Sequence, residues 1–120
     1  MSKKGDRHAL ITINGKPTTI EALEGTKGLY KIPVEGSPSP LTFTLDVPIC
    51  YQKADFTLYC SLNEEESPDH ENNDKQIFRK KKFLFPAPKF RRHFQSTDII
   101  YIGVISEVGC SFNMTVTSPP

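Results

Sequence analysis

Short stretches in which apolar and polar residues alternate recur along the chain, and this two-residue period is typical of β-strands with one buried face. The clearest is "LTFTLDVPI" at 41–49, where Leu41, Phe43, Leu45 and Val47 share one side and polar residues the other. The further stretches with this character are 10–13, 18–23, 28–36, 54–60, 76–85, 99–105 and 111–117. The sequence therefore predicts seven or eight short strands.

Helical periodicity is absent, since no window of about 11 residues places apolar residues at i, i+3, i+4 and i+7. Short strands separated by turn signals predict an all-β fold, an antiparallel jelly-roll-like β-sandwich. Each sheet is expected to bury one face and to present a threonine-rich face to water. The stretch "IIYIGVI" at 99–105 is apolar on both sides, so we expect a central strand that is covered on both faces.

The 120 residues predict a single domain at 1–120, with a core at about 10–117, a flexible N-terminus at 1–8 and a flexible acidic loop at 63–75. Eight Phe and no Trp predict a core built on phenylalanine, and ten Pro imply many turns. Because the chain lacks an apolar run of signal-peptide or membrane-spanning length, we expect a soluble, cytoplasmic protein.

Three cysteines, Cys50, Cys60 and Cys110, are too few and too widely spaced for a zinc signature. We interpret them as small, reduced, partly buried apolar residues of a reducing compartment. For an exported protein the alternative is a bridge from Cys60 to Cys50 or to Cys110.

The runs "GLYKIPVEGSPSPLTFTLDV", "ADFTLYCSL", "KKFLFPAP" and "IIYIGVISEVGCSFNMTVT" follow one another in an order that resembles the bacterial pre-peptidase C-terminal domain over residues 24–117. Calpain-type, C2-like β-sandwich domains share a similar plan and are a second, weaker resemblance. The first resemblance implies a non-catalytic jelly roll attached to another protein, in some members with a calcium site or an affinity for insoluble polymers. Where that family often has paired aspartates, this chain has only Asp55.

Catalytic motifs are missing: the sequence has no G-x-S-x-G, H-E-x-x-H, C-x-x-C or phosphate-binding glycine loop. His8, His70 and His93 lie in charged surroundings. A nucleophile and base formed by Cys60 and His93 is the weaker interpretation, because the alternation places Cys60 on the buried face of its strand. We therefore expect no enzymatic activity, no cofactor and no metal.

Charge is sorted into two adjacent blocks. Residues 64–74, "EEESPDHENND", carry six acids and no Lys or Arg, whereas residues 75–92, "KQIFRKKKFLFPAPKFRR", carry eight Lys or Arg and no acid. The acidic block predicts a solvated loop. Calcium binding is the alternative there, with Glu64, Glu66, Asp69 and Asp74 as ligands.

The basic block is expected to form one extended strand at a sheet edge. Alternate side chains of a strand point in opposite directions, and four consecutive cations cannot be accommodated in a central strand whose side chains are buried. Lysines at such an edge deter unwanted strand pairing. The loop "KFRRHF" at 89–94 is expected to fold back beside the strand and to interleave Phe90 and Phe94 with the cations. The candidate partner-binding residues are Arg79, Lys80, Lys81, Lys82, Lys89, Phe90, Arg91 and Arg92.

This patch predicts a non-catalytic interaction or targeting module, an accessory domain of a larger intracellular assembly that binds an acidic protein surface. The first alternative is a C2-like module on anionic phospholipid, worth about 1 kcal/mol per basic residue near the surface, with calcium in the acidic loop. The second is a single-stranded RNA binder with phenylalanines stacked on bases. Against nucleic acid stand the missing RNP-like motif and a net charge of only +1. The sequence predicts no oligomeric state.

Overall fold

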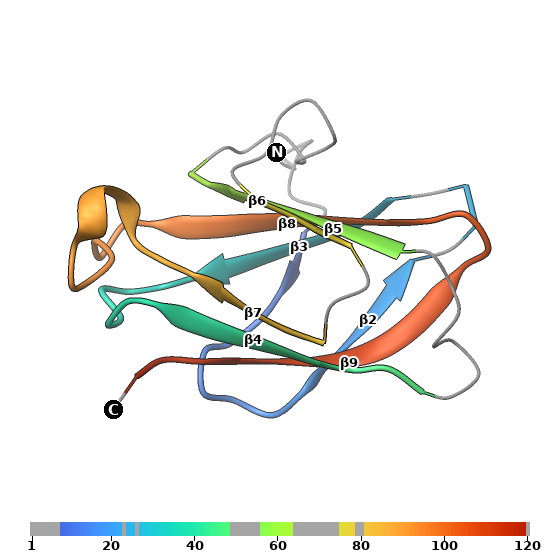
Figure 1. Cartoon of the computed structure of the whole chain (residues 1–120), viewed down its shortest axis with the longest axis horizontal. Coiled ribbons are helices and arrows are strands. Elements are labelled where there is room, and N and C mark those ends of the chain that lie inside the picture. Colours follow the sequence, from blue (N-terminus) through green and yellow to red (C-terminus); the bar gives the residue numbers. More distant parts are fainter. Residues whose placement is uncertain are drawn as a thin grey trace, which may run out of the picture.

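Two β-sheets stack face to face in the computed structural model, which describes residues 8–22, 24–25, 27–48, 56–63, 75–78 and 81–119. The five-stranded sheet has the order β1-β3-β8-β5-β6 and lies above the four-stranded sheet, β2-β9-β4-β7, in Figure 1. The predicted all-β sandwich is confirmed, with nine strands in the described residues. They are β1 (Ala9–Leu10), β2 (Thr18–Ala22), β3 (Lys27–Pro33), β4 (Leu41–Asp46), β5 (Phe56–Leu62), β6 (Lys75–Phe78), β7 (Lys82–Phe85), β8 (Ile99–Ser106) and β9 (Cys110–Thr117).

Strand β8 is the centre of the five-stranded sheet, as its two-sided apolar pattern predicts. It pairs antiparallel with β3 on one side and with β5 on the other. The exception to antiparallel pairing is β1, which runs parallel to β3 through two residues. The strand expected at 10–13 is shorter than predicted, since β1 ends at Leu10. The chain then turns at Asn14, whose φ is 60°.

The stretch 76–85, predicted as one strand, is two strands in different sheets. Strand β6 pairs with β5, whereas β7 pairs with β4. The buried side chains Ile77, Phe83 and Phe85 all fall on odd positions, so a continuous strand would also direct Lys81 into the core. Burying an unpaired ammonium is costly, and crossing between sheets avoids it. Both strands are edges, so the predicted edge location is confirmed.

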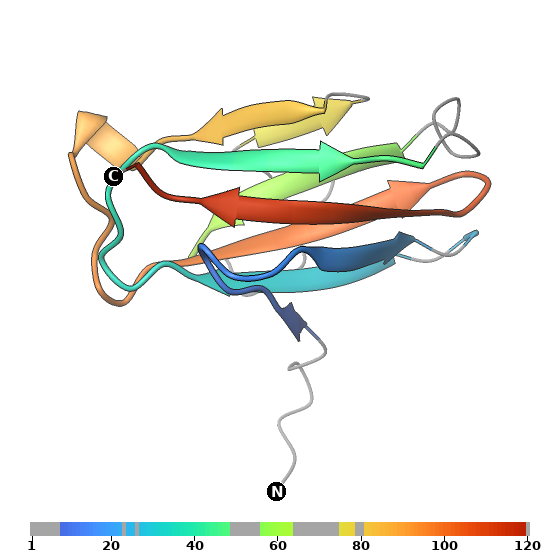
Figure 2. The ribbon, with the colours of Figure 1, turned by 90° about the horizontal axis from the view of Figure 1, so that it is seen from below.

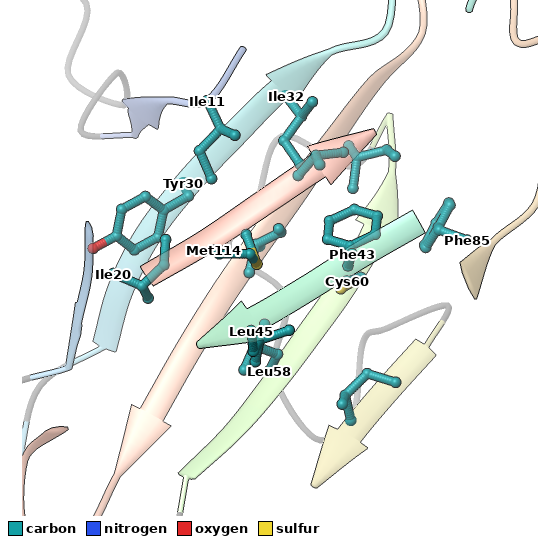
Figure 3. Packing of buried hydrophobic residues seen from close by; sticks show 14 of the residues in the cluster. Ile11, Ile20, Tyr30, Ile32, Phe43, Leu45, Leu58, Cys60, Phe85 and Met114 are labelled. Carbon is teal, nitrogen blue, oxygen red and sulfur yellow. The ribbon is translucent and has the colours of Figure 1, made fainter. Parts of the chain in front are cut away.

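Phenylalanine side chains form much of the core, as expected. Phe43 stacks on its cross-strand partner Phe83 with ring centroids 4.6 Å apart. Phe56 of one sheet stacks on Phe112 of the other at 4.7 Å. Figure 3 shows side chains of β4 and β5 meeting between the sheets. This packing holds the sandwich together through buried apolar area.

The outer faces of the two sheets differ. Thr44 and Thr117 are exposed on the four-stranded sheet, so the threonine-rich face meets water there as predicted. On the five-stranded sheet, Tyr59 and Tyr101 are only 8% and 7% exposed, so the expectation that the outer face of each sheet meets water is wrong at these positions. The His8 ring covers part of this face, with its centroid 5.1 Å from that of Tyr101 in an edge-to-face contact.

The outer edge of β2 is closed by a side chain from the other sheet. The backbone N–H of Glu21 donates to the hydroxyl of Tyr30 at 2.8 Å, and that hydroxyl donates to the carbonyl of Glu21 at 3.4 Å. Gly28 permits the approach, because a Cβ there would lie 2.5 Å from the same carbonyl oxygen. The sheets are thus tied together where β2 and β3 meet.

Candidate partner-binding edge

Strand β7 forms one edge of the four-stranded sheet, at the top of the view in Figure 2. The N–H of Leu45 in β4 donates to the carbonyl of Lys81 at 2.7 Å. Because bonding alternates along an antiparallel pair, Phe83 also bonds to β4, whereas the backbone groups of Lys82 and Leu84 point outward. The side chains of these two residues are exposed, Leu84 by 49%.

The basic loop that follows is anchored to the segment preceding β4. It includes a short 3-10 helix, η2 (Pro88–Phe90). The N–H of Ala87 donates to the Ser39 hydroxyl at 2.8 Å, and the Ser39 N–H donates to the carbonyl of Arg92 at 2.8 Å. The N–H of Phe94 reaches the Ser37 carbonyl at 2.9 Å. The loop therefore has a defined position at the end of β7.

The predicted cations that the structure describes lie in two groups along one edge. Lys82 begins β7 and Lys81 directly precedes it, whereas the other three follow the end of the strand, where the loop lies at the left of Figure 2. The loop runs past the strand and not beside it, so the expected fold-back beside β7 is wrong. We call the five exposed cations the basic edge: Lys81, Lys82, Lys89, Arg91 and Arg92.

The aromatic part of the prediction needs correction. Phe94 is 3% exposed and packs against Phe85, with ring centroids 6.4 Å apart. It is a core residue because its turn directs the ring back over the end of β7. The side chain of Phe90, and all of Arg79 and Lys80, lie outside the described residues.

Leu84 is the residue of this edge that sequence reasoning missed. The side chain of Leu84 points away from those of Phe83 and Phe85, because its position in the strand is even and theirs are odd. The signal was present in "KFLF", where Lys82 and Leu84 share a side.

Nucleophile chemistry finds no support at the two cysteines that the structure describes. Cys60 is fully buried in the core, while His93 is exposed, so the pair considered above does not form. Burial also raises the pKa of the Cys110 thiol above its ordinary value of 9.0, which disfavours the reactive thiolate. Cys60 and Cys110 are buried thiols, whereas Cys50 lies outside the described residues.

Within the part of the chain that the structure describes, no group of three or more His, Cys, Asp or Glu is placed to hold a metal ion. The four carboxylates considered for calcium at 64–74 lie outside the described residues. A shallow pocket of about 250 Å³ between 10–14 and 33–37 is lined by one ionisable residue, Glu35, and is separate from the basic edge.

Asp98 is a buried carboxylate with a structural role. It is 5% exposed and accepts hydrogen bonds from the Asn63 side-chain amide at 2.8 Å and from the Gln95 N–H at 2.9 Å. These bonds fix the turn that returns the basic loop to β8. Both carboxylate oxygens of Asp98 accept bonds that hold the turn in place, so we assign this residue a structural role and no catalytic one.

The helix that the described residues form is η2, which has three residues. Within the same residues, no helix is long and apolar enough to span a bilayer.

The solved structures that are similar to this chain include the following two. The crystal structure of Yersinia pseudotuberculosis-derived mitogen matches with a TM-score of 0.58 and 14% identity, over 87% of this chain and 85% of that one. The pre-peptidase C-terminal domain of collagenase from Bacillus anthracis matches with a TM-score of 0.56 and 15% identity, over 96% and 99%. No protein-family model and no curated protein matches the sequence. At these identities the likeness shows the fold alone, and at that level the resemblance to the pre-peptidase C-terminal domain is confirmed.

Proposed function

We propose that this chain is a non-catalytic β-sandwich module, an accessory part of a larger intracellular assembly, that binds an acidic protein surface through the basic edge. The observation that carries the proposal is that five exposed cations lie in two groups, at the start of β7 and in the loop that follows its end. Residues 75–97 of the sequence contain no acid. Such a surface attracts and orients an acidic partner.

The shape of the basic edge favours an elongated partner. Strand β7 has four residues and so spans about 13 Å, at roughly 3.3 Å per residue, with cations at both ends. Cations spread over this length suit an acidic stretch of polypeptide better than a single compact anion.

The absence of catalysis is supported by the site chemistry and by the fold. The thiols that the structure describes are buried, and one structural neighbour is a pre-peptidase C-terminal domain of a collagenase. The RNA alternative loses one of its two candidate stacking residues, because Phe94 is in the core. Anionic phospholipid remains the competing ligand, and the test includes it.

The test compares four proteins as bait in a native extract. The first three are the wild type, a variant in which all five cations of the basic edge are replaced by Ala, and a variant with Lys81→Arg, Lys82→Arg and Lys89→Arg; the fourth is a control. We expect the wild type and the Arg variant to retain the same acidic protein. The Ala variant should retain at least tenfold less of it than the wild type does. Lys16→Ala, at an exposed lysine of the 12–17 turn, controls for generic loss of a lysine.

Two results would contradict the proposal. One is equal retention by the Ala variant, which would show that the basic edge is not involved. The other is binding to phosphatidylserine vesicles, abolished in the Ala variant, with no protein retained, which would assign the basic edge to a membrane surface.

A further inference from the structure

The sheet edges of the sandwich differ in how far a further strand can approach. The outward backbone groups of Glu21 on the β2 edge are already bonded to Tyr30. Strand β1 has only two residues. Strand β7, in contrast, has β4 on one side and no strand on the other in the described part of the chain. An incoming strand would therefore find β7 more accessible than β2 or β1.

The outward groups of β7 form a short ladder. The N–H and C=O of Lys82 and of Leu84 point away from β4, since Lys81 and Phe83 carry the bonds to that strand. Pro86 ends the donor series because proline has no N–H. The ladder thus offers two complete donor and acceptor pairs.

The side chains beside these groups specify what pairs with them. Lys82 and Leu84 stand on the outer face, so an antiparallel strand would place an acidic residue opposite Lys82 and an apolar one opposite Leu84. One acid, Asp46, also lies on this face, two residues beyond Thr44, the register partner of Lys82. Because the exposed Lys81 adjoins Lys82, cations outnumber acids at this end of the edge in the described residues.

A second copy of this chain fits the edge poorly. Pairing two β7 strands antiparallel through their outward groups would place Lys82 of each copy opposite Leu84 of the other, so neither copy would offer a carboxylate to the other's lysines. An acidic strand would offer a carboxylate opposite Lys82. The charge of the edge therefore favours an acidic strand over a second copy.

We propose that β7 binds an extended acidic segment of the partner as a fifth strand of the four-stranded sheet, antiparallel to β7. This inference rests on the proposed function and deepens it by naming the form of the partner. Main-chain bonds to Lys82 and Leu84 supply affinity, and the alternating side chains supply specificity. Cations beyond the end of β7 contact acids that precede the paired residues.

The test uses the synthetic peptide acetyl-Glu-Ser-Val-Val-Glu-Glu-amide. Its first valine lies opposite Leu84, and the first glutamate of its final pair lies opposite Lys82. One derivative is N-methylated at these two residues, whose N–H groups face β7. The matched derivative is N-methylated at the second valine and the last glutamate, whose N–H groups face away. Binding to the intact chain is measured by NMR titration.

We expect the first derivative to bind at least fivefold more weakly than the parent peptide, and the second derivative to bind as the parent does. On binding, amide exchange at Lys82 and Leu84 should slow, while Phe83 should change little. Leu84→Pro should reproduce the loss from the protein side, because proline has no N–H to donate to the peptide. The variant should still fold, since the Leu84 N–H faces away from β4. Leu84→Ala, which keeps the N–H, is its control.

Equal binding of the two derivatives would overturn strand addition. The proposed function would survive that result if the Ala variant of the basic edge still lost its captured partner. Failure of the parent peptide to bind, or protection of Lys82 and Leu84 by dimerisation in the free protein, would also overturn it. Should Leu84→Pro not fold, the two derivatives decide the matter on the wild-type chain.

Discussion

A single tyrosine hydroxyl connects the two sheets at the β2 edge. Tyr30 belongs to β3, yet its hydroxyl bonds both backbone groups of Glu21 in β2. Burial raises the pKa of Tyr30 above its ordinary value of 10.0, since the neutral hydroxyl is favoured in the folded state. The unfolded chain therefore ionises first as the pH rises, and stability falls above about pH 10.

Tyr30→Phe should lower the free energy of unfolding by about 1 kcal/mol at pH 7, the typical net value of such a bond. It should also reduce the loss of stability above pH 10, because the group that ionises first on unfolding is gone. Chemical denaturation at pH 7 and pH 10.5 measures both effects. An unchanged alkaline decline would show that Tyr30 does not cause it.

Asp98→Ala should destabilise the protein by about 2–4 kcal/mol, because it leaves two donors, on Asn63 and Gln95, without their acceptor. Asp46→Ala, at an exposed carboxylate, should change stability by no more than about 0.5 kcal/mol. Urea denaturation compares the two variants. Similar losses in both would contradict the structural role given to Asp98.

At the scale of elements, β7 divides its residues between two environments. Phe83 packs on Phe43 in the core, and the next residue, Leu84, is half exposed. Phe83→Ala should cost about 3–4 kcal/mol, as for other buried phenylalanines. Leu84→Ala should cost less than about 1 kcal/mol. Thermal unfolding of the pair checks this, and a reversed order would mean that the register of β7 is wrong.

The division of 76–85 into β6 and β7 shows what alternation cannot predict. Ile77, Phe83 and Phe85 keep a single phase across the break, so the pattern is the same for one strand as for two. The crossing follows from the cost of burying the intervening cations, which depends on the position of the second sheet. Local spacing predicted β4, β8 and β9 well because each is one uninterrupted alternation or apolar run.

At the scale of the whole molecule, the two edges of the four-stranded sheet differ: Tyr30 bonds the outward groups of Glu21 on the β2 edge, whereas no strand of the described residues pairs with the outer side of β7. The sequence indicated that the basic block lies at an edge, and the structure confirms this. It did not indicate that the cations divide between the two ends of β7 or that Phe94 is buried. Those features depend on bonds from the loop to Ser37 and Ser39, which are distant in sequence.

The covered outer face of the five-stranded sheet was likewise missed. Tyr59 alternates with core residues and so reads as solvent-facing, but its low exposure reflects packing that no local pattern contains. The single-domain boundaries stay a prediction, as do the partner and its location.

Amide hydrogen exchange along β7 in the free protein tests the central claim, the open edge, most directly. The account predicts slow exchange at Phe83 and Phe85, which bond to β4, and fast exchange at Lys82 and Leu84, which face outward. Equal protection of all four amides, or protection in the opposite phase, would contradict it.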